Sequence, residues 1–256
     1  MSKKSICIIP ARMSSSRLPS KPMKDINGVP MIGHVYLRVK MCQLLTETYV
    51  ATCDREIFDY IEGIGGKAVM TLDTHERCTD RTAEATLIIE ENTGEKVDIV
   101  VMIQGDEPMT TPEMIEKSLE PMLDNSEILV LNLMAKIKTE QEFEDPNEVK
   151  VVVGLDGDAV YFSREPIPSR KKGYTKVPML KQVCVIPFRR DYLFKFNEMP
   201  ETPLERIESV DMMRVIEHGD KVKMVMTETE TLSVDTQEDL DKVVELMKQD
   251  QFLTFY

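Results

Sequence analysis

The chain has 256 residues, 42% of them hydrophobic, and a formal net charge of −13. This length and hydrophobic content are typical of a globular protein built as one α/β domain or as a domain with a substantial insertion. The negative charge disfavours nucleic acids and anionic membranes as partners, because long-range repulsion opposes association. No segment approaches the roughly 20 apolar residues that span a bilayer, so we expect a cytoplasmic protein without membrane contact. The five cysteines include no CxxC pair, which favours reduced thiols over disulfides or a zinc site.

An apolar run over residues 6–9 leads directly into a loop over residues 10–22. The loop has prolines near both ends and three cations, Arg12, Arg17 and Lys21, with Ser14 among them. Proline disfavours helix, so the remaining backbone N–H groups are left free to face an anion. Guanidinium and ammonium groups bind phosphate oxygens. A solvated basic turn is the alternative, but the position after the first strand of an α/β fold favours a polyphosphate site.

Apolar β-rich runs and helical patterns alternate along the first half of the chain. Strands are predicted over residues 6–9, 48–52, 68–71, 99–103 and 128–133, and helices over 31–45, 55–64, 80–91 and 112–123. Thr79 and Thr111 are the candidate N-caps of the last two helices. The alternation predicts an α/β fold with a mostly parallel sheet and helices on both faces.

The pattern changes after residue 145, where a second, smaller and β-rich subregion begins. Residues 149–153 and 159–162 predict a hairpin around Asp156-Gly157-Asp158, and residues 165–178 predict a mobile loop. A strand over 183–188, a helix over 204–218, strands over 222–226 and 232–234 and a helix over 237–249 follow. We therefore expect one domain with a core of residues 1–145 and 219–256 and a subregion of about 146–218.

Two aspartates follow apolar segments in positions that suit a metal ion. Asp106 comes after the buried run 99–103 and lies between Gly105 and Pro108, at the carboxyl edge predicted for the opening loop. Asp235 follows Val234 and precedes the last helix. Each could simply cap or turn the chain. Mg²⁺, however, is commonly held by one or two carboxylates that share it with phosphate and water, which makes the pair a candidate magnesium site.

A series of motifs, in order and over nearly the whole length, resembles the 3-deoxy-manno-octulosonate (Kdo) cytidylyltransferases, also called CMP-Kdo synthetases. The motifs occupy residues 10–22, 25–32, 50–52, 65–66, 79–81, 104–108, 161–164, 203–205 and 234–236. The resemblance implies a Rossmann-like fold with a substrate and dimerisation subregion, and a homodimer with contacts in 165–190. It also implies a reaction in which the anomeric hydroxyl of a 2-keto-3-deoxy sugar acid attacks the α-phosphate of CTP, with Mg²⁺ as cofactor, and pyrophosphate leaves.

The resemblance also assigns roles to residues of this chain. The catalytic set is Arg12, Lys21 and Asp106, and the metal ligands are Asp106 and Asp235. The nucleotide site comprises Pro10, Ala11, Arg12, Ser14, Arg17, Lys21, Arg81 and Gln104. The sugar-acid site comprises Arg164, Gln182, Glu205 and Glu208. Phosphoryl transfer depends mainly on positioning and charge stabilisation, which agrees with cations and a metal on the triphosphate.

The chain departs from the family where the family meets its sugar acid. Residues 182–188 replace a stretch that usually contains a histidine, two tyrosines and two glycines, and Asp211-Met212 replaces a glutamate–glutamine pair. Sites that pair substrate hydroxyls discriminate through such groups, so the acceptor is predicted to be Kdo or a related, modified acid.

Two other functions compete with this interpretation. A sugar-1-phosphate nucleotidyltransferase would share the strand, basic loop and aspartate, but it predicts a Gly-rich opening loop, which Pro10-Ala11-Arg12 is not. A catalytically silent nucleotide-binding homologue is disfavoured by the presence of Arg12, Lys21, Asp106 and Asp235.

Overall fold

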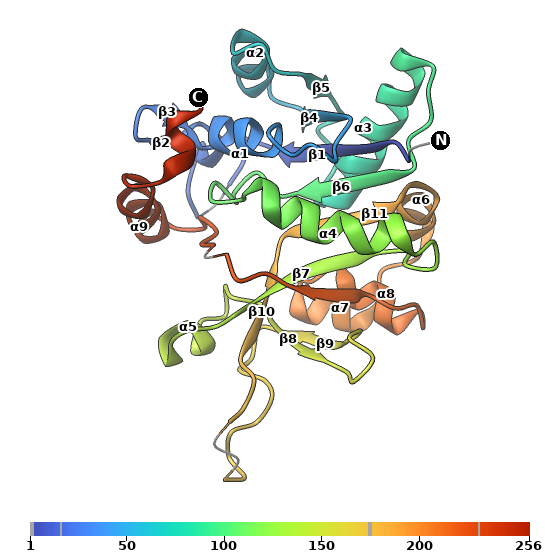
Figure 1. The fold of residues 1–256 in the computed structure, drawn as a ribbon, viewed down its shortest axis with the longest axis vertical. Helices are drawn as coiled ribbons and strands as arrows, with labels where there is room; N and C mark the ends of the chain where they lie inside the picture. The colour runs from blue at the N-terminus through green and yellow to red at the C-terminus, as the bar shows by residue number, and fades with distance from the viewer. Residues whose placement is uncertain (1–2, 16, 174–175, 230) are drawn as a thin grey trace.

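The computed structural model describes residues 3–15, 17–173, 176–229 and 231–256. Within them one sheet has five strands in the order β11-β6-β1-β4-β5 (Figure 1). Its strands are β1 (Ser5–Ala11), β4 (Glu47–Thr52), β5 (Ala68–Met70), β6 (Ile99–Ile103) and β11 (Val185–Arg189). The first four run parallel and β11 pairs antiparallel with β6. The predicted α/β fold with a mostly parallel sheet is confirmed.

Both faces of this sheet are covered by helices, as expected for parallel strands. Along β1, Ile6 and Ile8 pack on the side of α3 (Cys78–Thr93) and α6 (Arg190–Glu198). The alternate residues Cys7 and Ile9 pack on the side of α1 (Met31–Val39), α2 (Arg55–Gly63) and α4 (Pro112–Asp124). Successive side chains of a strand point to opposite faces, so one apolar run supplies both layers. Helix α1 ends at Val39, earlier than predicted.

A second five-stranded sheet has the order β12-β7-β10-β8-β9 and lies below the first in Figure 1. Its strands are β12 (Lys223–Met226), β7 (Leu131–Lys136), β10 (Leu180–Val183), β8 (Lys150–Val153) and β9 (Ala159–Ser163). The antiparallel pair β8–β9 confirms the predicted hairpin. The sheet takes β7 and β12 from outside residues 146–218. The predicted mobile loop 165–178 includes residues 174 and 175, which lie outside the described part of the chain.

The prediction of a single strand over residues 183–188 is wrong. β10 pairs with β7 as far as Val183, and β11 pairs with β6 from Val185 onward, so the chain crosses from one sheet to the other at Cys184. Both halves are apolar, and periodicity alone cannot show that they belong to different sheets. The crossing places Gln182, Cys184 and Ile186 between the two sheets.

Three other predictions from the sequence also differ from the structure. The helix expected over 204–218 is two helices, α7 (Pro203–Glu208) and α8 (Met212–Glu217), because Ser209 between them adopts a left-handed backbone with φ 53°. Thr79 is not an N-cap, since α3 already begins at Cys78. Residues 232–234 form no strand. They lead to α9 (Gln237–Met247), whose capping box joins Thr236 and Asp239.

The remaining elements are short. They are α5 (Glu140–Glu144), the two-stranded pair β2 (Asp25–Ile26) and β3 (Val29–Pro30), and the 3-10 turns η1 (Lys21–Met23) and η2 (Gln251–Thr254). Neither α5 nor α6 was predicted. In the described ranges no helix combines the length and the apolar character that a membrane crossing needs.

Candidate active site

The opening loop and the loop after β6 leave the same edge of the first sheet. β1 and β6 are parallel neighbours, with Ile8 opposite Met102, so their carboxyl ends lie side by side. Ligands bind at such a point in open α/β sheets, where the strand order reverses. Gly105 allows the close approach, because a Cβ there would lie 3.1 Å from the Pro10 carbonyl oxygen and 3.3 Å from the Ala11 Cβ.

Lys21 joins the two predicted metal carboxylates. Its Nζ lies 2.7 Å from Asp106 Oδ2 and 3.1 Å from Asp235 Oδ1, and Arg17 Nη2 lies 2.9 Å from the same Asp235 oxygen. The backbone N–H of Val234 donates to the Asp106 carbonyl at 3.0 Å, which holds the two segments together. Burial lowers the pKa of Lys21, but the charges and hydrogen bonds of both aspartates outweigh burial and raise it. Lys21 is therefore a permanent cation at this edge.

The two aspartates fit a small oxygen-binding cation. Asp106 Oδ1 is buried and has no hydrogen-bond partner in the described structure, so one carboxylate oxygen has unused capacity. No group of three His, Cys, Asp or Glu side chains suited to a metal occurs among the described residues. Mg²⁺ does not need one, since it is usually bound through one or two carboxylates plus phosphate oxygens and water.

A cavity of about 290 Å³ extends from these carboxylates into the space between the two sheets. Its lining includes seven of the predicted site residues: Arg17, Lys21, Gln104, Asp106, Arg164, Gln182 and Asp235. A smaller adjoining hollow of about 50 Å³ is lined by four more, Pro10, Ala11, Arg12 and Arg81. Glu76, Arg77 and Cys78 line both spaces. Ser14 is exposed and borders neither.

The smaller hollow is bordered by two cations with N–H groups that the protein does not use itself. Arg12 is exposed and forms no ion pair with another described residue. Arg81 is buried and donates through Nη1 to Thr71 Oγ1 and the Leu72 carbonyl oxygen. Its Nη2 is buried without a partner in the described structure. Buried donors without partners are costly, so a ligand with acceptor oxygens would stabilise this arginine.

Arg164 and Gln182 reach the larger cavity from the second sheet and its crossing. Arg164 donates to the carbonyl oxygens of Glu208 and Pro146, both at 2.7 Å, and to that of Ser209 at 3.4 Å. It forms no side-chain ion pair within the described ranges, so its charge remains available to a substrate anion. Gln182 Nε2 donates to Asn132 Oδ1 at 2.5 Å.

The structure does not bring Glu205 and Glu208 to the cavity. Glu205 is fully buried, and its two oxygens accept from Arg214 Nη2 and Nε at 2.6 and 2.7 Å. Glu208 is nearly buried and accepts from Ser163 Oγ at 2.9 Å and from the Arg164 backbone N–H at 2.8 Å. Both carboxylates are thus bonded to the protein's own groups, and neither lines the cavity or the smaller hollow.

Sequence reasoning missed Arg77 as a residue of the cavity wall. Its guanidinium contacts Asp211 at 2.6 Å and Glu201 at 2.8 Å, while Thr79 Oγ1 also donates to Asp211 at 3.1 Å. These bonds connect the start of α3 with the α7–α8 junction, and thus one side of the cavity with the other. The available signal was a cation two residues before the Thr79-Asp80-Arg81 motif.

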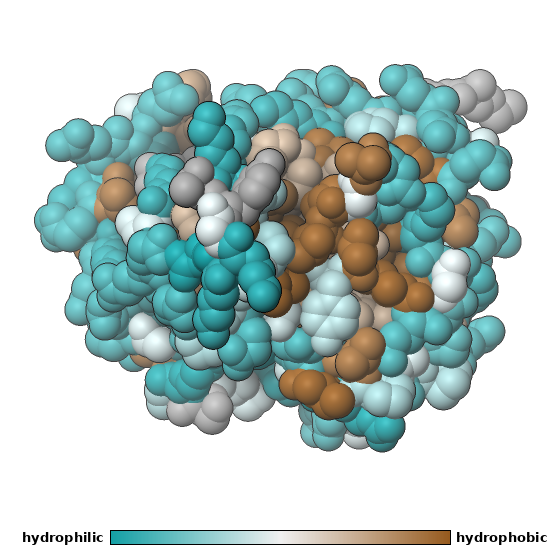
Figure 2. Space-filling view, turned by 90° about the horizontal axis from the view of Figure 1, so that it is seen from below, coloured by the Kyte–Doolittle hydropathy of each residue, from teal (hydrophilic) through white to brown (hydrophobic). Residues whose placement is uncertain are grey.

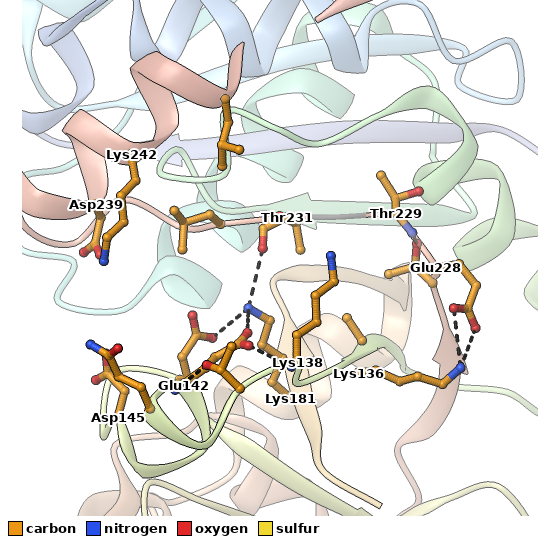
Figure 3. A pocket seen from close by; sticks show the side chains of 17 residues that line it. Lys136, Lys138, Glu142, Asp145, Lys181, Glu228, Thr229, Thr231, Asp239 and Lys242 are labelled. Atoms are coloured by element: carbon orange, nitrogen blue, oxygen red, sulfur yellow. Dashed lines mark hydrogen bonds and ion pairs between the residues drawn. The ribbon is translucent and has the colours of Figure 1, made fainter. Parts of the chain in front are cut away.

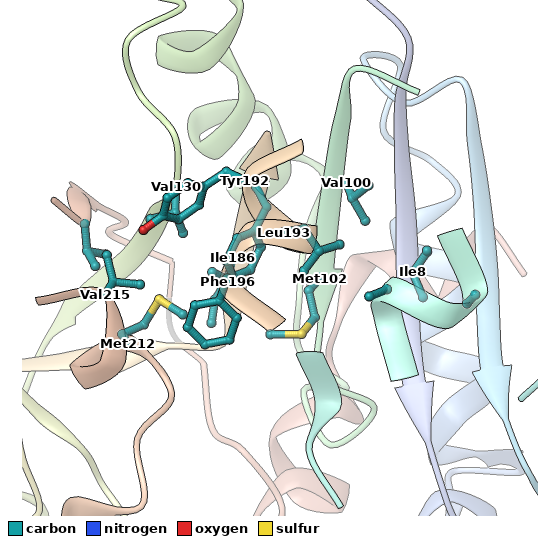
Figure 4. Packing of buried hydrophobic residues seen from close by; sticks show 14 of the residues in the cluster. Ile8, Val100, Met102, Val130, Ile186, Tyr192, Leu193, Phe196, Met212 and Val215 are labelled. Carbon is teal, nitrogen blue, oxygen red and sulfur yellow. The ribbon is translucent and has the colours of Figure 1, made fainter. Parts of the chain in front are cut away.

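One wall of the cavity is apolar. It is formed by Cys78, Met102, Val149, Cys184, Ile186, Val210 and Met212. Figure 4 shows Met102, Ile186 and Met212 grouped around the ring of Phe196. Burial raises the pKa of Cys78 to about 12 and that of Cys184 well above its usual value. Both thiols therefore stay protonated at neutral pH and offer no thiolate nucleophile.

A second hollow of about 410 Å³ lies between β7, β10, α5 and α9 and shares no lining residue with this cavity (Figure 3). Among the described residues it is lined by charges of both signs, many of them paired. Lys181 contacts Glu142 at 2.7 Å and Glu148 at 3.2 Å, and Lys136 contacts Glu228 at 3.2 Å. The hollow therefore lacks the excess of positive charge that a polyphosphate requires.

Comparison with known proteins agrees with the site. A sequence model of the cytidylyltransferase family matches residues 6–224. A 3-deoxy-manno-octulosonate cytidylyltransferase of Geobacter metallireducens is 39% identical and covers 95% of this chain and 98% of its own length. The corresponding protein of Solibacter usitatus is 38% identical, with 97% of this chain and 96% of its own length covered.

Solved structures extend the comparison to three dimensions. The structure of CMP:2-keto-3-deoxy-manno-octonic acid synthetase complexed with CTP is 38% identical and superposes with a TM-score of 0.86 over 97% of this chain and 100% of that one. A putative glucose-1-phosphate thymidylyltransferase from Bacillus anthracis, at 14% identity and a TM-score of 0.67 over 98% of this chain and 97% of that one, shares the fold alone. The resemblance inferred from the motifs is confirmed.

Proposed function

This chain belongs to the cytidylyltransferase family, and we propose that it transfers a cytidylyl group from CTP to the anomeric hydroxyl of a 2-keto-3-deoxy sugar acid, Kdo or a related acid. The hydroxyl oxygen forms a bond to the α-phosphorus, its proton passes to solvent, the bond to the bridging oxygen breaks, and pyrophosphate leaves. The observation that carries the proposal is the meeting of Arg17, Lys21, Asp106 and Asp235 at one end of the 290 Å³ cavity.

The donor half of the site is proposed to hold CTP. Arg12 and Arg81 border the smaller hollow, where exposed and unpartnered N–H groups suit the acceptor oxygens of a nucleotide. Lys21 and Arg17 then neutralise the triphosphate, with Gln104 beside them. Their present bonds to Asp106 and Asp235 keep these cations ordered before the nucleotide arrives, which reduces the reorganisation needed during the reaction.

Mg²⁺ is the proposed cofactor, with Asp106 and Asp235 as its ligands. The unused oxygen of Asp106 and the nearness of both carboxylates to Lys21 support this assignment. When bound, Mg²⁺ would neutralise phosphate charge and stabilise the charge that develops on the leaving pyrophosphate.

The acceptor half lies between the second sheet and the α7–α8 junction. Arg164 is the proposed partner of the substrate carboxylate, since a guanidinium binds a carboxylate through two parallel N–H bonds. Glu208 supports it by holding the Arg164 backbone and accepting from Ser163. Glu205 is proposed to support the acceptor half indirectly, because it pairs with the buried Arg214 and lies 3.5 Å from Arg77 of the cavity lining.

A homodimer is proposed to form through the lower face of the second sheet. Figure 2 shows hydrophobic residues gathered on the face seen from below, which is the end where Figure 1 places β8 and β9. On this hairpin Val160 is 54% exposed and Leu155 is fully exposed. Exposed apolar patches of this kind mark interaction surfaces. Sedimentation at several concentrations tests the assembly, and a monomer throughout would contradict it.

The enzymatic proposal is tested by incubating the protein with CTP, MgCl₂ and Kdo and measuring pyrophosphate release. We expect release with CTP and much less with ATP or UTP. Asp106→Asn, which keeps the side-chain size, should abolish it, whereas the matched exposed variant Asp73→Asn should not. Release from TTP with glucose 1-phosphate, but not from CTP with any sugar acid, would favour a sugar-phosphate nucleotidyltransferase. Binding of CTP without turnover of any acid would favour a silent homologue.

A further inference from the structure

We propose that Glu107 and Thr231 are positioning residues, which hold Asp235 beside Asp106 so that the two carboxylates bind one metal ion together. This inference rests on the proposed function and names the contact that keeps its metal site assembled when CTP binds. Neither Glu107 nor Thr231 lines the cavity of about 290 Å³. Both residues therefore act through Asp235 and not on the substrates.

Asp235 lies on a segment that has no regular secondary structure. Residues 227–229 and 231–236 connect β12 to α9 and form neither helix nor strand. Such a segment has no ladder of backbone hydrogen bonds to fix it, so the place of Asp235 depends on contacts with other parts of the chain. The backbone N–H of Asp235 donates to Asp239 Oδ2 at 3.2 Å, which joins it to α9 but not to Asp106.

The ion pairs of Asp235 cannot hold it throughout the reaction. Lys21 and Arg17 contact its Oδ1 at 3.1 and 2.9 Å. In the proposed function both cations neutralise the triphosphate, so they are no longer available to hold this carboxylate. Contacts that do not involve the substrates must then keep the segment beside Asp106.

In the described part of the chain, two hydrogen bonds join this segment directly to the loop after β6. The Val234 backbone N–H donates to the Asp106 carbonyl oxygen, and Thr231 Oγ1 donates to Glu107 Oε2, both at 3.0 Å. Glu107, Thr231 and Val234 are 3%, 9% and 0% exposed. A hydrogen bond in so buried a place is stronger than one in water and costly to leave unmade, so the bond between Glu107 and Thr231 fixes the segment at a second point.

Lys181 supports the same contact from the second sheet. Its Nζ donates to the Thr231 carbonyl oxygen at 3.5 Å and is itself paired with Glu142 at 2.7 Å (Figure 3). Thr231 is thus held through both its backbone and its side chain. Outer groups that orient metal ligands in this way typically contribute about 10–100-fold to metal affinity.

The first test measures the dissociation constant of CTP by calorimetry in MgCl₂ and in EDTA, because the ratio of the two constants reports on the metal site without turnover. Thr231→Val keeps the shape of the side chain and removes the hydroxyl, and Glu107→Leu removes the acceptor. Each should reduce the gain in affinity that Mg²⁺ provides by about tenfold or more. The double variant should lose little more than the greater single loss, because both changes remove the same hydrogen bond. Thr231→Ala serves if Thr231→Val does not fold.

Conservative variants separate positioning from a general loss of structure. Thr231→Ser keeps the donor and Glu107→Gln keeps an acceptor oxygen, so both should retain most of the gain from Mg²⁺. Thr86→Val is the matched control, since Thr86 is fully buried on α3 and does not line the cavity. Its hydroxyl donates to the Thr82 carbonyl oxygen at 2.8 Å. Its replacement should leave the gain unchanged.

The second test measures pyrophosphate release at increasing Mg²⁺ concentration. Thr231→Val should need about tenfold more Mg²⁺ or higher for half of the maximal rate. The Michaelis constant for Kdo at saturating Mg²⁺ should stay nearly unchanged, because Thr231 and Glu107 do not line the cavity. A change in that constant with no change in the requirement for Mg²⁺ would contradict the inference.

The calorimetric results can also overturn it. Thr231→Val and Glu107→Leu that both keep the parent's gain from Mg²⁺ would do so, as would equal losses in Thr86→Val and Thr231→Val. A loss in Glu107→Gln as large as that in Glu107→Leu would mean that the charge of Glu107 matters and not its bond to Thr231. A parent whose affinity for CTP does not depend on Mg²⁺ would overturn the proposed metal site, and this inference with it. Absence of pyrophosphate release with every acid, together with the expected calorimetry, would overturn the proposed function alone.

Discussion

Replacing Lys21 by methionine removes the only cation that contacts both Asp106 and Asp235 among the described residues. The distances from Nζ are 2.7 and 3.1 Å, and the three side chains are 14%, 20% and 19% exposed. Two unit charges 4 Å apart interact by about 4 kcal/mol at an effective dielectric constant near 20. Because these groups keep some contact with water, screening reduces that value. We expect Lys21→Met to lower the free energy of unfolding by about 1–3 kcal/mol, since two neighbouring carboxylates lose their shared cation.

Urea denaturation in EDTA measures this loss, and the same experiment with MgCl₂ tests its origin. A divalent cation on the two carboxylates would replace the missing charge, so the difference between parent and variant should narrow with Mg²⁺. The rate of pyrophosphate release should fall by about 10²–10³-fold, as expected when a donor to developing charge is removed.

Lys24→Met is the matched control for this experiment. Lys24 follows the same 3-10 turn and forms no ion pair with a described residue. Its replacement should change the free energy of unfolding by no more than about 0.5 kcal/mol. Equal free energies of unfolding for Lys21→Met and the parent in EDTA, or equal losses for both lysine variants, would refute the reasoning.

Further predictions concern the supports of the site and the pH dependence of stability. Arg214→Met removes the bidentate partner of the buried Glu205 and leaves it with Arg77 Nη2 at 3.5 Å. Chemical denaturation should therefore show a loss of about 3 kcal/mol. Adding Glu205→Gln should recover part of this loss, and no recovery would contradict the pairing. Gly105→Ala places a Cβ 3.1 Å from the Pro10 carbonyl oxygen. We expect the free energy of unfolding to fall by about 1–3 kcal/mol, and calorimetry should show a lower melting temperature. An unchanged melting temperature would mean that the backbone moves to accommodate the Cβ without a loss of stability. Burial lowers the pKa of His34 from 6.5 despite the hydrogen bond to the Ile26 carbonyl oxygen. The unfolded chain then binds more protons at acidic pH, so stability should fall as the pH drops below about 6.5, and His34→Gln should show a smaller fall in urea titrations at neutral and acidic pH.

Much of the fold follows from local pattern. The run 6–9 and the segment 99–103 are buried strands because their apolar residues can face helices on both sides of a parallel sheet. The hairpin 149–162 follows from alternation around a Gly-containing turn. Such signals extend over a few residues and need no knowledge of distant partners. They fail at Cys184, where the chain passes from one sheet to the other, and at Ser209, where a helix is interrupted. Neither cysteine nor serine is a residue type that predicts such a change.

The candidate site divides in the same way. The sequence predicted the chemistry of the site from arginines and a lysine after the first strand and an aspartate after β6. This prediction was possible because the carboxyl ends of strands in a parallel sheet share one edge. Only the tertiary structure decided that Asp235 joins Asp106, that Glu205 pairs with Arg214 and does not line the cavity, and that Arg77 connects the two sides of the cavity. Those contacts depend on how separate elements pack, and packing is set by the whole core rather than by the segments that carry the residues.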